Sequence, residues 1–186
     1  MYNAPYTDFM SKFYSNYFNV MDNTGGEGVM AVVSNILRVA IMHRIADTYG
    51  PIPYSKVGNG AFEVEYDALE TLYPRLIEDI SASISQLEGY NTASPIFSEY
   101  DVLFGGDFKK WQKYANSIKF RIALRMSSMD QEFAKKAMQE AVNSGMLLDD
   151  NDVATLSTDD NPVYKASVSW GYLLGKCDYY YLYEWL

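Results

Sequence analysis

Residues 28–48 read GVMAVVSNILRVAIMHRIADT, a strongly periodic segment that sets the fold class. Apolar side chains recur at steps of three and four, as they do along one face of an α-helix. They are Val29, Val32, Val33, Ile36, Leu37, Ala40, Ile41 and Ile45. Polar residues such as Arg38 and His43 interrupt the segment, so it falls short of the roughly 20 apolar residues of a membrane span. We predict an amphipathic helix whose apolar face is buried.

The segments on either side repeat this pattern. It predicts further helices over about residues 6–21, 67–87, 107–126 and 128–143. Loops rich in glycine, proline and asparagine separate them, and the pattern weakens beyond Leu148. Short loops between amphipathic helices favour helical hairpins stacked side by side, so the predicted fold class is all-α. The tetratricopeptide consensus itself is not visible in the sequence.

Three residues bear on where the helices begin. Asp67 is expected to cap the third helix and Ser128 the fifth, each with a Glu or Gln three residues later that completes a capping box. Pro74 is unfavourable in a helix interior, where it costs about 3 kcal/mol. The third helix is therefore expected to kink at Pro74 or to begin near Thr71.

The composition narrows the possible partners. The chain has 186 residues with 15 basic and 24 acidic side chains, and this net charge of −9 argues against binding to nucleic acid or anionic lipid. Its 17 tyrosines, 9 phenylalanines and 3 tryptophans suit the stacking of sugar rings, and they suit helix packing equally well. A single cysteine, Cys177, allows no internal disulfide.

Motifs for catalysis, metal or cofactor binding are missing from the sequence. The lone histidine, His43, has no acidic or cysteine partner at metal-ligand spacing, and Cys177 lacks a recognisable catalytic partner. The glycines near residue 26 are not followed by the Lys-Ser/Thr of a phosphate loop. We predict a protein that is not an enzyme and needs no metal or cofactor. A glycosidase with paired carboxylates stays open as an alternative, because the separation of such a pair is a three-dimensional property.

Three segments, taken in order, carry a resemblance to a known family. They are LRVAIMHRIADTYGPIPYS at 37–55, YDALETLYPRLIEDI at 66–80 and DVLFGGDFKKWQKYANSIKFRIALRMS at 101–127. Together they resemble the SusD/RagB family of Bacteroidetes outer-membrane lipoproteins, in particular its SusD-like subgroup. The resemblance is strongest over residues 30–164, and the third segment is its most specific part.

The third segment contains the family's signature. Its residues here are Gly105, Gly106, Asp107, Trp111, Asn116, Arg121 and Arg125. The two glycines allow a tight turn before the helix, and the aspartate can accept the free amide hydrogens at its start. The tryptophan is expected in a packing stripe, and the two arginines can bind carboxylates or helix-end carbonyls. We interpret the signature as structural rather than as a ligand pocket.

The resemblance implies a right-handed, tetratricopeptide-like stack of helix pairs. It also implies a cell-surface protein, tethered to the outer membrane by an N-terminal lipid, that lids a SusC-type TonB-dependent transporter. Such proteins bind oligosaccharides or peptides without cleaving them and pass them to the transporter. The alternative from another class is a helical-repeat protein-interaction module with no small ligand.

The sequence departs from the family in its length and at its ends. Family members are longer, no secretory signal or lipid-anchor cysteine is visible near the start, and residues 165–186 form an aromatic tail that does not match. We therefore expect an incomplete SusD-like domain over residues 1–164. Candidate ligand contacts are the aromatic residues expected in loops, because loops carry function more often than helix stripes do. They are Tyr54, Tyr90, Tyr100 and Phe104.

Overall fold

The computed structural model describes residues 4–58, 60, 63–90, 95–147 and 152. Within these ranges the chain forms six α-helices, and the single β feature there is an antiparallel bridge between Ile52 and Asp67. The helices are α1 Ala4–Thr24, α2 Gly28–Tyr49, α3 Leu69–Glu88, α4 Pro95–Tyr100, α5 Phe108–Met126 and α6 Gln131–Ser144. The predicted all-α class is confirmed. The predicted tail at 165–186 lies outside the described residues.

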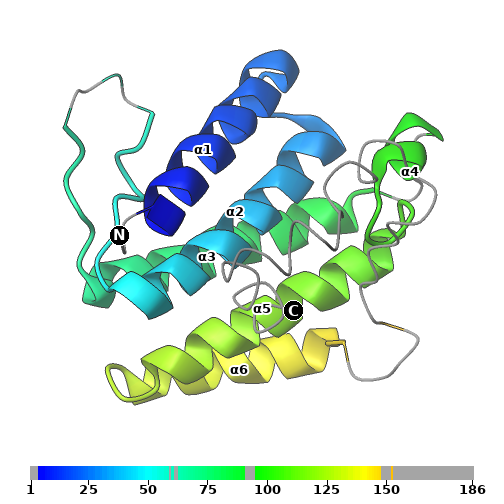
Figure 1. The fold of residues 1–186 in the computed structure, drawn as a ribbon. Helices are drawn as coiled ribbons and strands as arrows, with labels where there is room; N and C mark the ends of the chain where they lie inside the picture. The colour runs from blue at the N-terminus through cyan, green and yellow to red at the C-terminus, as the bar shows by residue number, and fades with distance from the viewer. Residues whose placement is uncertain (1–3, 59, 61–62, 91–94, 148–151, 153–186) are drawn as a thin grey trace, which may run out of the picture.

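Helix α2 is the centre of the fold. It packs against α1, α3 and α5, while α3 packs against α5 and α5 against α6 (Figure 1). Ile36 and Met42 of α2, Ile80 of α3 and Ile122 of α5 are fully buried between these helices. Burying a side chain of this size stabilises the fold by roughly 1.5–3 kcal/mol. Stacked helical hairpins thus share one continuous core.

The apolar character of α2 is explained by this position. With 22 residues, α2 is long and apolar enough to cross a membrane by length and composition, and 56% of the window that passes this test is buried inside the protein. A core helix of a globular domain passes the same test. Here α1, α3 and α5 cover the apolar face of α2.

Both predicted helix caps are wrong. The residue before α3 is Ala68, whose side chain makes no capping hydrogen bond, and the Asp67 carboxylate binds the turn at residues 54–55 instead. Helix α6 begins later than predicted, and its cap is Asp130, not Ser128. The Asp130 carboxylate accepts a hydrogen bond of 3.0 Å from the Phe133 amide. A carboxylate two residues closer to the helix thus takes the cap position.

Helix α3 begins at Leu69 rather than near Thr71, and it runs through Pro74 to Glu88. Proline has no N–H, so the carbonyl of Glu70 receives no helical hydrogen bond from position 74. The buried face of α3, which includes Leu72, Leu76 and Ile80, offsets this local cost. The short helix α4 was not predicted at all.

His43 is buried in α2, and its pKa provides a test of the packing around this helix. Its side chain is 1% exposed, its Nδ1 lies 3.2 Å from the Val39 carbonyl, and its Nε2 has no hydrogen-bond partner among the described residues. Since a carbonyl only accepts, Nδ1 carries the proton of the neutral ring. Burial lowers the pKa of His43 to about 4, and the nearby charges of Arg121 and Arg44 act in the same direction.

We expect His43 to weaken the fold in acid. A folded pKa below the unfolded value of 6.5 means that this stability is complete above pH 6.5 and is lost as the pH falls toward 4. At the acidic end the free energy of unfolding is lower by about 3 kcal/mol, at 1.36 kcal/mol for each unit of pKa difference. His43→Met should remove this loss of stability in acid. Urea unfolding at pH 7.5 and pH 4.5 should therefore show a smaller difference in the free energy of unfolding for the variant than for the unaltered chain. An equal pH effect in both proteins would mean that His43 has the same pKa in the folded and unfolded states.

Candidate functional site

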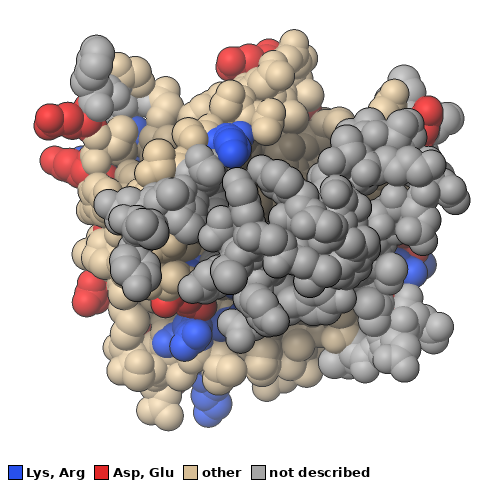
Figure 2. Space-filling model, in the orientation of Figure 1, with Lys and Arg blue, Asp and Glu red and all other residues tan. Residues whose placement is uncertain are grey.

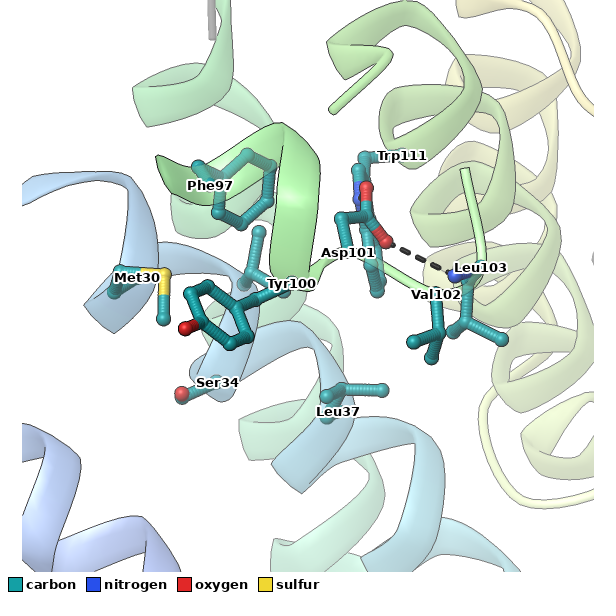
Figure 3. Close-up of a pocket in the computed structure, with 10 residues that line it drawn as sticks. Met30, Ser34, Leu37, Phe97, Tyr100, Asp101, Val102, Leu103 and Trp111 are labelled. Carbon is teal, nitrogen blue, oxygen red and sulfur yellow. Dashed lines mark hydrogen bonds between the residues drawn. The ribbon is translucent and has the colours of Figure 1, made fainter. Parts of the chain in front are cut away.

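An open hollow of about 200 Å³ lies where α2, α4 and the start of α5 meet (Figure 3). Side chains from α2, α4, the 101–103 segment and α5 line it. They are Met30, Val33, Ser34, Leu37, Phe97, Tyr100, Asp101, Val102, Leu103 and Trp111. The lining is mostly apolar. The volume is below the roughly 300–1,000 Å³ of pockets that enclose a whole drug-sized ligand, so the hollow suits part of a larger molecule.

Tyr100 is the exposed aromatic residue of this hollow. It is the last residue of α4, and its side chain is 69% exposed. In Figure 3 its ring lies over the side of α2 that carries Met30 and Ser34. A tyrosine held this way offers a flat apolar face with a polar tip, which is the surface on which a sugar ring stacks.

The carboxylate of Asp101 organises the segment between α4 and α5. Its Oδ1 accepts hydrogen bonds from the amides of Leu103 and Phe104, both at 3.1 Å. Its Oδ2 accepts from the Gly106 amide at 2.8 Å and from Trp111 Nε1 at 2.7 Å. Four donors thus occupy the two oxygens. Asp101 fixes the wall of the hollow and has little capacity left to bind a ligand.

The start of α5 continues this arrangement. Gly105 and Gly106 have φ values of +60° and +85°, which residues with a β-carbon rarely adopt. Asp107 then caps α5, and its Oδ1 accepts from the amides of Lys109 and Lys110 at 2.9 and 3.2 Å. The tight turn brings the loop back over α5, where the Phe104 ring meets Trp111 edge-on at 5.1 Å between centroids.

The four predicted ligand contacts fall into different environments. Tyr100 is exposed at the hollow, and Phe104 is buried beside Trp111. Tyr90 is half-buried and packs edge-on against Phe108 at 5.9 Å. Tyr54 is 1% exposed and lies in the turn after α2, where the Arg38 guanidinium covers its ring. In this structure Tyr100 is therefore the accessible ring of the four.

Tyr54 anchors the turn after α2. The Arg38 guanidinium lies over its ring at 4.0 Å and donates to its carbonyl at 2.8 Å, while its hydroxyl donates to Asp79 at 2.7 Å. Burial raises the pKa of Tyr54, and the Asp79 carboxylate raises it further. The Asp67 carboxylate accepts from the amide of Tyr54 and from the amide and hydroxyl of Ser55. Although burial opposes it, these bonds lower the pKa of Asp67.

The remaining signature residues lie on α5. Asn116 is buried, whereas Arg121 is exposed. The Arg125 Nε donates to Asp47 of α2 at 3.2 Å, and Asp47 also accepts from the Tyr73 hydroxyl of α3 at 2.7 Å. This carboxylate thus joins three helices. Because the Arg125 side chain is largely exposed, its ion pair contributes little by itself.

Sequence reasoning missed the roles of Asp101 and Asp67. Each accepts from backbone amides of a turn, and Asp101 does so two, three and five residues ahead, as aspartates in turns often do. That spacing could have predicted the role of Asp101 from the sequence. For Asp67 the partners lie 12 and 13 residues earlier, so no local pattern shows them.

Charged groups do not define a site on the face shown in Figure 2, where the described Lys, Arg, Asp and Glu side chains are interspersed. Within the described ranges, no three His, Cys, Asp or Glu side chains come together as a group that could hold a metal ion. The candidate site is therefore an apolar hollow beside the exposed ring of Tyr100. It offers an apolar surface and an aromatic ring against which a ligand can pack.

The fold defines the class of protein first: an all-α domain of stacked helical hairpins around a central α2. Comparison with family models is more specific, because the SusD-like model, described as SusD and RagB outer membrane lipoprotein, matches residues 1–178. The chain belongs to this family, and the resemblance of its three sequence segments is confirmed.

Solved structures agree with the family assignment. A SusD-like protein from Bacteroides thetaiotaomicron VPI-5482 aligns with a TM-score of 0.76 and 29% identity, covering 81% of this chain and 31% of that chain. A SusD homologue from Bacteroides uniformis ATCC 8492 aligns with a TM-score of 0.69 and 33% identity, covering 83% and 33%. A protein described as a chitin-binding SusD homologue from Flavobacterium johnsoniae aligns with a TM-score of 0.69 and 27% identity, covering 85% and 34%.

The chain spans about a third of the length of these similar structures. No match was found among the curated proteins. The comparisons therefore define the family and the fold of this portion, including the hairpin stack that carries the hollow.

Proposed function

We propose that this chain is part of a non-catalytic protein that captures oligosaccharides at the outer-membrane surface. Membership in the SusD/RagB family of outer-membrane lipoproteins over residues 1–178 is the observation that carries the proposal. A similar structure is described as chitin-binding, which favours a glycan over a peptide ligand. The exposed ring of Tyr100 beside the hollow supplies the kind of surface on which sugars stack.

The proposal extends to location and partner. We place the full-length protein on the cell surface, held by a lipid anchor, with a SusC-type TonB-dependent transporter as the partner that receives the captured ligand. Family membership supports both points. Co-purification of the full-length protein with such a transporter tests the partner, and recovery of the protein without it in mild detergent would contradict that part.

Tyr100→Ala is expected to weaken glycan binding at least about tenfold, because a stacked aromatic side chain at the centre of a binding surface is commonly worth more than 1 kcal/mol. The measurement is isothermal titration of the chain with a panel of soluble oligosaccharides and with a peptide mixture. Released reducing sugar is assayed in parallel, and none is expected.

Tyr66→Ala is the matched control. Tyr66 is also a strongly exposed tyrosine, 61% exposed, but it stands in the loop before α3 and does not line the hollow. Its removal should leave affinity unchanged. Binding of peptides but not of any glycan would overturn the proposed ligand class, and equal affinity of Tyr100→Ala and the unaltered chain would move the site elsewhere.

A further inference from the structure

The hollow offers few hydrogen-bonding groups to anything that enters it. Its polar groups are the Ser34 hydroxyl, the Tyr100 hydroxyl and the Asp101 carboxylate. Asp101 already accepts from four donors, and the single N–H of the Trp111 ring is one of them. Among the lining side chains, only the two hydroxyls are therefore left to meet a polar ligand group. The other lining side chains are hydrocarbon, thioether and aromatic.

Such a lining selects against an unsubstituted sugar ring. A neutral sugar carries a hydroxyl on most of its carbons, and each hydroxyl loses its water when it is buried. Two protein hydroxyls cannot replace so many bonds. A small acyl group has the opposite balance, because its methyl gains from leaving water while its amide needs only one or two hydrogen bonds.

Size and charge point the same way. The hollow holds about 200 Å³, while a water molecule takes up about 30 Å³ of liquid, so there is room for a substituent but not for an oligosaccharide. The chain has a net charge of −9, and the one charged group of the lining is an anion whose oxygens are already occupied. An uncharged group fits this electrostatic environment better than a carboxylate or a sulfate.

We infer that the hollow is a subsite for the acetamido group of a 2-acetamido sugar. The methyl of this group enters between the α2 and α5 side chains that include Leu37 and Trp111. The sugar ring stays outside and stacks on Tyr100 (Figure 3). This inference rests on the proposed function, and it adds the substituent that the site selects and the residues that select it.

A matched ligand series tests the inference. Chito-oligosaccharides, cello-oligosaccharides of the same length and de-N-acetylated chito-oligosaccharides share one backbone and linkage, and they differ at the C2 substituent. Isothermal titration should give at least about tenfold tighter binding for the acetylated series, which corresponds to 1.4 kcal/mol. Equal or tighter binding of the cello series would overturn the inference while leaving glycan capture intact. Binding of no glycan at all would overturn the proposed function as well.

Ser34→Met tests the location of the subsite. Ser34 is half-buried on α2 at the lining, so a longer side chain there fills the hollow without entering the core. The variant should lose the preference for acetylated ligands, with affinities for the acetylated and cello series converging within about twofold. Thr48→Met, an exposed position near the other end of α2, is the control and should keep the full preference. An undiminished preference in a folded Ser34→Met variant would place the subsite elsewhere.

Discussion

Trp111→Ala is expected to lower the free energy of unfolding by about 3–5 kcal/mol, the usual cost of removing a large buried aromatic side chain. Trp111 is 2% exposed, and it meets Phe104 and Tyr114 edge-on at 5.1 and 5.8 Å between ring centroids. Its Nε1 donates to Asp101. The substitution therefore leaves a cavity at the start of α5 and frees one acceptor of the carboxylate that holds the 101–106 loop.

Urea unfolding monitored by circular dichroism measures this effect. Since domains are typically stable by only 5–15 kcal/mol, the variant should unfold at a much lower urea concentration or fail to fold. Trp111→Phe keeps an aromatic ring and loses the N–H, so it should cost less than the alanine variant and stay folded for measurement. A loss below about 1 kcal/mol in Trp111→Ala would show that the cluster around Trp111 does not support the fold.

Helix positions could be predicted from the sequence because their signal is local. The stripe over 28–48 became α2, and the expected helix at 107–126 became α5. Periodicity reports which face of a helix is buried, and in these two helices burial decides the structure. Helix α4 has only six residues, too few to show a period, and it was missed for that reason.

Helix starts were less predictable, because a carboxylate has several possible partners. Asp67 looks like a cap from its spacing to Glu70, yet its oxygens bind the amides of Tyr54 and Ser55 across a loop. Two backbone amides and a hydroxyl at one turn outcompete the helix start. Only the fold brings that turn to Asp67, so the sequence alone favours the wrong partner.

The candidate site also combines features that a local sequence signal predicts with features that depend on tertiary contacts. Tyr100 could be predicted as an accessible aromatic from its place in a polar, turn-rich segment. The burial of Tyr54 and Phe104 depends on Arg38 and Trp111, which reach them from other elements. A loop aromatic is thus accessible only if no helix side chain is positioned to cover it, and that condition is tertiary.

Asp101→Ala is expected to lower the free energy of unfolding by about 2–4 kcal/mol, because hydrogen bonds to a charged group are worth about 1.5–3 kcal/mol each and are only partly replaced by water. The amides of Leu103, Phe104 and Gly106 lose their common acceptor, and so does the buried Trp111 N–H. Asp101→Asn keeps one acceptor oxygen but turns an NH₂ group toward two of these donors. It should therefore lie between the alanine variant and the unaltered chain.

A double-mutant cycle of Asp101→Ala with Trp111→Phe isolates the bond from Trp111 Nε1 to Asp101 Oδ2, which is 2.7 Å long. Once the N–H is absent, loss of the carboxylate should cost less, and we expect a coupling energy of about 0.5–3 kcal/mol, as for residues in direct contact. Additive effects would mean that Asp101 acts only through the backbone amides of the loop. Since the same loop forms one wall of the hollow, Asp101→Ala should also weaken glycan binding in protein that remains folded. Unchanged affinity would mean that this wall does not contribute to glycan binding and that the ring of Tyr100 acts without it.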